Sequence, residues 1–323
     1  MANLSVKYLG LELSNPVIIS SSPLTASAEK VAILAEHGAG TVVLKSIFEE
    51  QIMGETAMLE RYSDYPEAAD YLHAYVGSDY IAGYLDMIRE CKQRVKIPVI
   101  ASINCSTSDA WIDYARRIHE AGADALELNI FLLPTDADTD AGQIESRYLE
   151  IVGQVVAAVP IPVSVKLGTR FTNILNVARQ IYFRRGRGVV MYNRFFEPDI
   201  DISSMTLTSA DSLSSPAELR NALRTTALCS AAQPELDVAV STGIHSGEDA
   251  VKAILAGASA VQVCSTVYQN GLGMINRIND FVANWMDKNS FEHVGDFRGK
   301  LDYKGVADAE VYQRVQFMRY FPK

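Results

Sequence analysis

The chain has 323 residues, 48 % hydrophobic and 21 % charged, which is globular composition and enough length for one large barrel or two ordinary domains. Its net charge of −10 disfavours nucleic acid or anionic membrane as a partner, and no apolar run approaches the roughly 18 residues of a membrane span. The four cysteines have no CxxC spacing, and the opening segment has no basic start or apolar run, so we expect no metal site, no disulfide framework, no secretory signal and a cytoplasmic protein.

The first predicted element is a small hairpin, with strands Val6–Tyr8 and Leu11–Leu13 on either side of the turn Leu9-Gly10. Beyond it, short apolar runs alternate with longer amphipathic segments, the pattern of repeated βα units. The candidate strands are Val17–Ser20, Thr41–Lys45, Val99–Ile103, Ala125–Asn129, Val163–Lys166, Val189–Tyr192, Val238–Ser241 and Ala260–Val263. No glycine- or proline-rich linker divides them, so we expect residues 1–323 to form one α/β domain, a closed (βα)8 TIM barrel with an N-terminal β-hairpin.

Three predicted connections are long, and all of them follow the carboxyl ends of strands: Phe48–Asp79, Ile130–Gly142 and Asn193–Ser214. In a barrel that end carries the active site, where long loops commonly form a lid over the substrate. After the last strand, Leu272–Lys288 is predicted to be the closing helix and Ala307–Arg319 a terminal helix.

Small residues end the last two predicted strands. The first of these runs into Ser241-Thr242-Gly243, and the second into Cys264-Ser265-Thr266. Small residues let backbone N–H groups approach an anion, and the loops after strands seven and eight of such barrels often bind phosphate. We therefore expect a phosphorylated cofactor to lie at the turns that follow these two strands.

Polar side chains end several other strands and would converge on one pocket: Ser20, Ser21, Lys45, Asn129, Lys166 and Asn193. A lysine at the end of an apolar strand is costly unless it meets an anion or a carbonyl group, which favours a functional role for Lys45 and Lys166. Snorkelling to solvent or a buried ion pair is the structural alternative. Asn129 and Asn193 could equally be amides that tie loops together.

These motifs together resemble the dihydroorotate dehydrogenases, and most closely their soluble, cytosolic branch. The matching pieces are Asn15-Pro16 with Ser20-Ser21-Ser22, LKS at Leu44–Ser46, ELN at Glu127–Asn129, VKL at Val165–Leu167, STGI at Ser241–Ile244 and GASAVQVCST at Gly257–Thr266. Their order and spacing agree over nearly the whole chain. The resemblance implies an FMN-binding barrel that passes hydride from dihydroorotate to flavin N5, acts in pyrimidine biosynthesis and forms a homodimer.

The resemblance also implies roles for individual residues. The isoalloxazine ring would touch Ser20, Ser21, Lys45, Ser46 and Asn129. Lys166 would face the N1–C2 region of the ring, where positive charge stabilises the reduced form. Ser102, Asn129 and Tyr192 would line the ring and ribityl chain, and the phosphate would lie on Thr242, Gly243, Cys264 and Ser265. Lys45, Asn129 and Asn193 would act on a dihydropyrimidine or similar small cyclic substrate.

Two segments depart from the family pattern. Where the family has an LSCPN-like segment with a Cys or Ser base, this chain places Leu132, which cannot accept a proton. The substrate loop after the second barrel strand is replaced by Asp64–Gly77, which has no matching asparagine. The substrate could therefore differ from dihydroorotate. Candidate replacements for the base are His73, Cys105, Tyr192 and the acidic run Asp136–Asp140.

Three functions are compatible with these residues. We favour an FMN-dependent oxidoreductase acting on CH–CH donors. A second hypothesis is a lyase or aldolase that binds a phosphorylated substrate and uses Lys45 or Lys166 as its reactive amine. The third is a flavin-binding barrel without catalysis, in which the replaced loop is an interaction surface.

Overall fold

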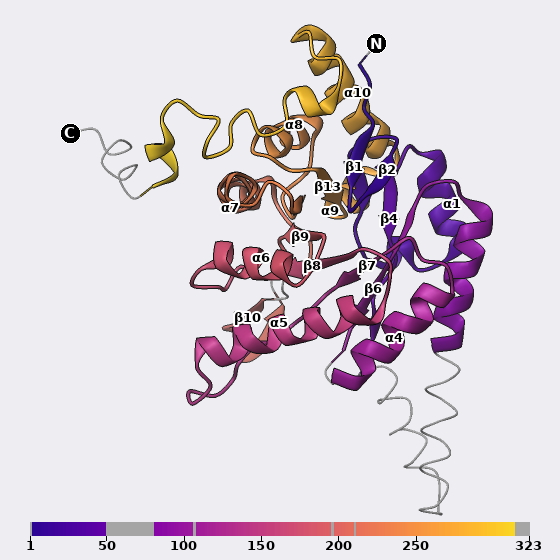
Figure 1. Cartoon of the computed structure of the whole chain (residues 1–323), viewed down its shortest axis with the longest axis vertical. Coiled ribbons are helices and arrows are strands. Elements are labelled where there is room, and N and C mark those ends of the chain that lie inside the picture. The colour runs from indigo at the N-terminus through magenta and orange to yellow at the C-terminus, as the bar shows by residue number, and fades with distance from the viewer. Residues whose placement is uncertain (1, 50–80, 106–107, 195–196, 210, 314–323) are drawn as a thin grey trace, which may run out of the picture.

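Eight parallel strands form a closed barrel in the computed structural model, which describes residues 2–49, 81–105, 108–194, 197–209 and 211–313 (Figure 1). The order around the barrel is β4-β3-β13-β12-β9-β8-β7-β6, and pairing of β4 with β6 closes it. A short ninth strand, β5, pairs with β6 near its carboxyl end. The strands are β3 Val17–Ile19, β4 Thr41–Val43, β5 Ile47–Phe48, β6 Val99–Asn104, β7 Ala125–Leu128, β8 Val163–Leu167, β9 Gly188–Met191, β12 Asp237–Ser241 and β13 Ala260–Val263.

Helices cover the outside of the barrel (Figure 1). They are α1 Ala28–Glu36, a helix over 81–94, α4 Ser108–Glu120, α5 Ala141–Ala158, α6 Ile174–Phe183, α7 Leu219–Ala232, α8 Gly247–Leu255, α9 Ser265–Asn270 and α10 Gly273–Lys288. Single 3-10 turns occur at η1 Pro23–Thr25, η2 Pro216–Glu218, η3 Val294–Asp296 and η4 Ala309–Tyr312. Local sequence sets several helix starts: Ser27 caps α1, and Asp140 forms a capping box with Gln143 at α5. The predicted (βα)8 barrel is confirmed.

The apolar core has two parts because strand side chains alternate between the two sides of the barrel wall. Outward residues such as Val17, Ile19 and Val42 pack against the helices. Inward residues form a second cluster, which consists of Tyr8, Leu9, Leu13, Ile18, Val43, Ile100, Ala125, Val190, Ala239 and Ala260. Tyr8 and Leu9 belong to the N-terminal hairpin, so the hairpin closes the amino-terminal end of the barrel and leaves the carboxyl end for a ligand.

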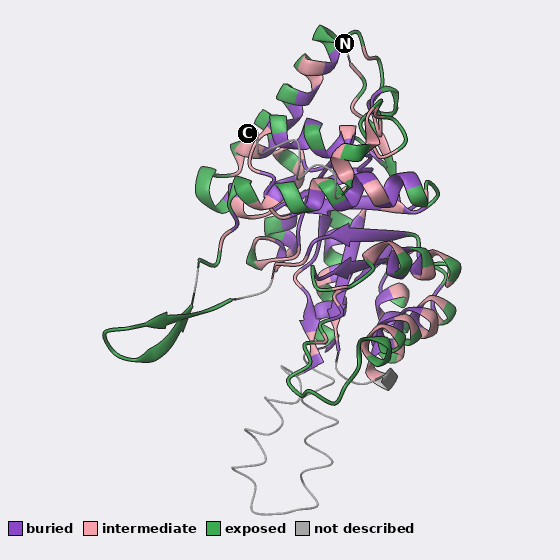
Figure 2. Cartoon of the chain, turned by 90° about the vertical axis from the view of Figure 1, so that its left-hand side faces the viewer, coloured by how far each residue is buried: buried purple, intermediate pink, exposed green. Residues whose placement is uncertain are grey.

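The N-terminal hairpin has the predicted bounds, β1 Val6–Tyr8 and β2 Leu11–Leu13, with Val6 opposite Leu13. The connection expected over Asn193–Ser214 contains a further antiparallel hairpin, β10 Pro198–Asp201 and β11 Thr206–Ser209. Figure 2 shows it extending away from the barrel, with all of its strand residues exposed.

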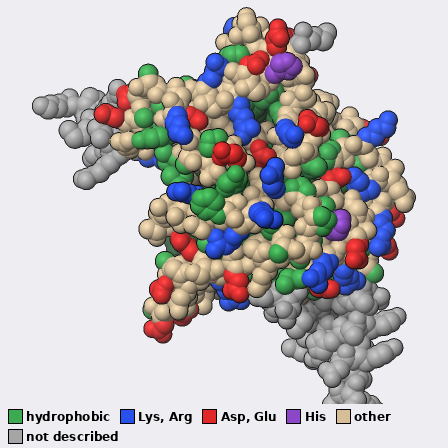
Figure 3. All heavy atoms as spheres, viewed as in Figure 1, with side chains coloured by type: hydrophobic (Ala, Val, Ile, Leu, Met, Phe, Trp, Pro, Cys, Tyr) green, Lys and Arg blue, Asp and Glu red, His purple; other side chains and the backbone are tan. Residues whose placement is uncertain are grey.

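The terminal helix predicted over Ala307–Arg319 is wrong in its described part. Only the 3-10 turn η4 forms there, and its residues lie at the surface with few apolar contacts to support a longer helix. The closing helix is confirmed as α10. Most of the connection Phe48–Asp79 lies outside the described residues, and so do Asp64–Gly77 and His73. None of the described helices is long and apolar enough to cross a membrane. On the face seen in Figure 3, basic and acidic side chains are intermingled.

Candidate functional site

A polar cavity of about 230 Å³ opens at the carboxyl ends of the barrel strands. Its lining comes from β8, β12 and β13 and from the segments that follow β3, β9, β12 and β13. The lining residues are Ser20, Ser21, Lys166, Asn193, Arg194, Ser212, Leu213, Ser214, Ser241, Thr242, Gly243, Ile244, Gln262, Cys264 and Ser265. Most of these side chains are hydroxyls or hydrogen-bond donors, which suits a polar and negatively charged ligand.

The loop after β12 bends sharply at the rim of this cavity. Thr242 and Gly243 both have positive φ angles, +74° and +85°. A side chain at Gly243 would collide with the backbone of Leu219, since a Cβ there would lie 2.3 Å from the Leu219 nitrogen. Only glycine therefore lets α7 start this close to the strand end, which keeps the backbone of this turn at the cavity wall.

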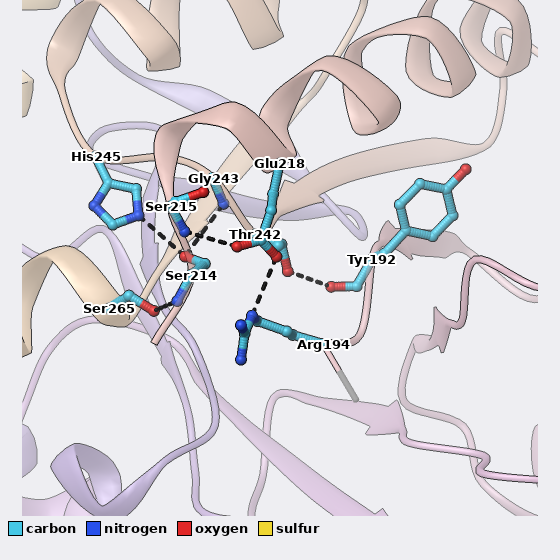
Figure 4. Close-up of polar contacts among 9 residues, drawn as sticks. All are labelled: Tyr192, Arg194, Ser214, Ser215, Glu218, Thr242, Gly243, His245 and Ser265. Carbon is cyan, nitrogen blue, oxygen red and sulfur yellow. Dashed lines mark hydrogen bonds and ion pairs between the residues drawn. The ribbon is translucent and has the colours of Figure 1, made fainter. Parts of the chain in front are cut away.

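Ser214 links the neighbouring loops at this rim (Figure 4). Its backbone N–H donates to the Ser265 hydroxyl at 2.9 Å, and its own hydroxyl lies 3.0 Å from Nε2 of His245 and accepts from the Gly243 N–H at 3.5 Å. Hydroxyl and N–H groups from three separate segments are thereby brought to one end of the cavity. Hydroxyl and backbone N–H donors gathered around a glycine turn in this way are suited to binding a phosphate group.

Arg194 lies between this cavity and a second one of about 200 Å³, which is also lined by Arg170. Its Nε donates to the Glu218 carboxylate at 3.1 Å, and the Ser215 N–H donates to the other carboxylate oxygen at 2.7 Å. Figure 4 shows the two terminal nitrogens of the guanidinium directed away from Glu218. Both charged side chains are about one third exposed, so this ion pair adds little stability and its main effect is to orient the guanidinium.

Lys166 lies at the floor of the cavity and is only 7 % exposed. Its ammonium donates to Ser20 Oγ at 3.0 Å, the Ser20 hydroxyl donates to Gln262 Oε1 at 3.0 Å, and Gln262 Nε2 donates to Glu127 Oε2 at 2.7 Å. Burial raises the pKa of Glu127, while Lys166 and the bond from Gln262 act in the opposite direction. An inward-pointing cation is therefore connected to a carboxyl group in the barrel interior.

The remaining polar side chains at the strand ends bond to one another. Ser21 Oγ lies 3.0 Å from Ser46 Oγ, which in turn lies 2.7 Å from Ser102 Oγ. The Asn193 amide donates to Asn129 Oδ1 at 2.7 Å, so the ends of β7 and β9 are joined above the floor of the cavity. These bonds fix the side chains in place, which is the property required of residues that orient a ligand.

The structure brings together most of the thirteen predicted site residues. Eight of them line the cavity: Ser20, Ser21, Lys166, Asn193, Thr242, Gly243, Cys264 and Ser265. Ser46, Ser102 and Asn129 are hydrogen-bonded to lining residues, directly or through one further hydroxyl. Lys45 follows β4, is half-buried and is not among the lining residues.

Tyr192 and the proposed replacements for the base lie elsewhere. The Tyr192 phenol points away from the cradle and donates to Thr225 on α7, so its hydroxyl is not placed to donate a proton in the main cavity (Figure 4). The exposed Asp136 carboxylate is occupied with Thr139 and the backbone of its own turn. Cys105 is buried. Leu132 packs partly against the core and lines two other cavities.

Sequence reasoning missed Arg194, Ser214, His245 and Gln262. Gln262 and Glu127 were detectable, because each is a polar residue on the inward side of a strand whose alternation also places Ser20 and Lys166 inward. Arg194 and Ser214 lie in a connection that has no periodic pattern. Their positions depend on contacts with α7 and with the loops after β12 and β13, which no local signal encodes.

A closed barrel, a cluster of hydrogen-bond donors after its last two strands and a lysine at the floor of its mouth define the class: a (βα)8 barrel with a polar cavity at the carboxyl ends of its strands. The chain belongs to the dihydroorotate dehydrogenase family, whose family model matches residues 3–286. This is a family of oxidoreductases acting on CH–CH donors, as the sequence analysis predicted.

Individual relatives agree with this assignment. The chain is 29 % identical to the catalytic subunit of dihydroorotate dehydrogenase B (NAD(+)) from Thermoplasma acidophilum, over 93 % of this chain and 99 % of that protein. It is 26 % identical to the protein of the same name from Methanocaldococcus jannaschii, over 88 % of this chain and 93 % of the relative. The counterpart from Methanocella arvoryzae is 29 % identical, over 88 % and 93 %.

Proposed function

We propose that this protein is an FMN-dependent dehydrogenase that oxidises a CH–CH bond in a small cyclic substrate, with dihydroorotate as the first candidate. The proposal is supported by family membership and by the donor-rich cavity above Lys166. FMN would supply the two-electron chemistry by accepting a hydride from the substrate.

The residues present fit FMN, and the cradle after β12 is the observation that carries the proposal. A phosphate would be held by the backbone of Thr242 and Gly243, with the Ser214 and Ser265 hydroxyls beside it. The guanidinium of Arg194 would add positive charge at the same end of the cavity. Ser20 and Ser21 would face the polar edge of the ring, together with Lys166.

Lys166 has two functions in this proposal: it binds the electron-rich edge of the cofactor, and it stabilises negative charge that collects there. Its ammonium is held by Ser20 and is shielded from bulk water, so its electrostatic effect is larger than that of an exposed lysine. The Asn129–Asn193 pair would orient a cyclic amide substrate through the amide groups left free by their mutual bond.

Leu132 replaces the base that is usual in the family and lies outside the main cavity, so another group must accept the substrate proton. We propose that a water molecule takes this proton. We further propose that a homodimer forms and that a partner protein carries electrons to NAD+. The relatives' names support only the second of these, since they are catalytic subunits of an NAD(+) enzyme.

Absorbance spectroscopy of the purified protein with added FMN tests the cofactor assignment. We expect saturable binding of one FMN per chain, with resolved flavin absorption bands. Anaerobic addition of dihydroorotate then tests the substrate: bleaching of the flavin within minutes supports the proposal. Bound FMN that stays oxidised would reject dihydroorotate, and a reductant panel without any bleaching would favour a non-catalytic barrel. Failure to bind FMN, with borohydride trapping of a carbonyl substrate on Lys45 or Lys166, would favour the lysine-dependent alternative.

A further inference from the structure

The hydrogen-bonded chain beneath Lys166 has a uniform direction. Lys166 donates to Ser20, Ser20 donates to Gln262, and Gln262 donates to Glu127. Each group thus donates toward the carboxyl group, as expected when a cation lies at one end and an anion at the other. The same chain with a protonated Glu127 as donor would need the Gln262 amide reversed and would leave the Ser20 hydroxyl without this acceptor.

Glu127 lies deep in the barrel interior. It is 1 % exposed, and its second oxygen, Oε1, has no hydrogen-bond partner among the described residues. The groups that face it come from the hairpin and the inner sides of two strands, β8 and β13: Tyr8, Ser164, Lys166 and Gln262. Tyr8 and Ser164 are neutral polar groups that interact with each other in the barrel interior. Burial raises the pKa of the Cys264 thiol, which lies above the floor, and the charge of Lys166 opposes this rise.

We propose that Glu127 is a positioning residue that acts through Gln262 and Ser20 to orient the Lys166 ammonium and to balance its charge. Lys166 is then the only one of the pair that touches the ligand, while Glu127 determines how much net positive charge the floor of the cavity presents. This deepens the proposed function, because Lys166 is the residue assigned there to the cofactor. Three hydrogen bonds and one amide group separate Lys166 Nζ from Glu127 Oε2, so these two atoms lie at most roughly 11 Å apart.

The primary test needs no cofactor. Lys166 in the apoprotein is labelled with a small amine-selective reagent at about pH 8, and the rate is read by mass spectrometry, with Lys45 as reference in the same digest. In general, removal of a neighbouring negative charge favours the neutral, reactive form of an amine. We therefore expect E127Q to label at Lys166 several-fold to about tenfold faster than the natural protein, and E127D to stay within about twofold of it. The rate at Lys45 should change in neither variant.

Two comparisons separate this electrostatic role from simple packing. S164A removes another buried hydroxyl beside Glu127 without breaking the chain, so it should alter thermal stability but not the labelling of Lys166. Q262M keeps the carboxyl group and the side-chain volume but interrupts the chain, and it should increase labelling in the same direction as E127Q. If E127Q proves poorly folded, the contrast among Q262M, S164A and the natural protein still decides the question.

A second readout connects the inference to the proposed function. With FMN bound, a redox dye at fixed potential should show a reduced-to-oxidised flavin ratio about tenfold higher in E127Q than in the natural protein, because the cavity floor becomes more positive. Equal labelling rates and equal flavin ratios in E127Q and the natural protein would overturn the inference and show a protonated, uncoupled Glu127. Faster labelling of Lys166 in E127Q, together with a natural protein that does not bind FMN, would support this inference and reject the proposed function.

Discussion

Replacement of Gly243 by alanine tests the close approach of β12 and α7 at the cavity rim. Gly243 has a φ of +85°, and an added Cβ would lie 2.3 Å from the nitrogen and 2.7 Å from the Cα of Leu219, the first residue of α7. Alanine in this left-handed conformation costs about 1–2 kcal/mol. Relief of the collision requires a shift of about 1 Å at the start of the helix, and overpacking of this kind adds about 1–3 kcal/mol.

The expected total is about 2–5 kcal/mol lost from the free energy of unfolding, a large part of the stability of a typical domain. The same shift moves Glu218, the residue before α7, which accepts hydrogen bonds from Arg194 and from the Ser215 N–H. The affinity for FMN should therefore fall by at least about tenfold, equivalent to about 1.4 kcal/mol. Urea unfolding followed by circular dichroism gives the first quantity, and quenching of FMN fluorescence gives the second.

Gly10 provides a matched control. It has a φ of +82° in the turn of the N-terminal hairpin, and a Cβ there would meet no atom within 4 Å. Gly10→Ala should therefore cost only the conformational contribution, about 1–2 kcal/mol, and leave FMN binding unchanged. If Gly243→Ala were no less stable than Gly10→Ala, the contact between the turn and α7 would not constrain this site and the reasoning would be refuted.

Three further predictions concern Glu127, two cysteines and Leu132. Burial raises the pKa of Glu127 above its usual 4.5, so ionisation of this carboxyl group costs the folded state more than the unfolded state. The free energy of unfolding of the natural protein should therefore fall relative to that of E127Q as pH rises from about 4.5 to 8. Urea unfolding measures this difference, and a difference that stays constant over this pH range would contradict the prediction. Burial raises the pKa of the Cys229 thiol to about 12, whereas Cys264 lines the cavity. Iodoacetamide at about pH 8 should therefore label Cys264 well before Cys229, and bound FMN should protect Cys264. Equal labelling rates of the two cysteines in the folded protein would refute this prediction. Leu132→Ser should lower the free energy of unfolding by about 1–3 kcal/mol. It should not speed the bleaching of the flavin by dihydroorotate, because Leu132 lines other cavities. A bleaching rate about tenfold higher than that of the exposed control Leu133→Ser would show that position 132 does reach the substrate.

The fold was largely predictable because its signals are local and repeated. Buried strands appear as short apolar runs, and alternation within them assigns side chains to the helices or to the barrel interior. The hairpin bounds, the eight barrel strands and α10 were found in this way. The terminal helix over Ala307–Arg319 was wrongly predicted because periodicity alone cannot show whether a helix has a surface to pack against.

The site residues likewise fall into those that local sequence signals identify and those that only the tertiary structure reveals. The sequence by itself determined the residues at the strand ends, such as Lys166 and Gly243, because parallel strands of a barrel must bring those ends together. Only the tertiary structure decided how they are held: Arg194 oriented by Glu218, Ser214 joined to the loops after β12 and β13, and Glu127 connected to Lys166. The physical reason is that a strand end is fixed by the hydrogen-bond ladder of the sheet. A long-range polar contact instead depends on the packing of segments that are far apart in the sequence.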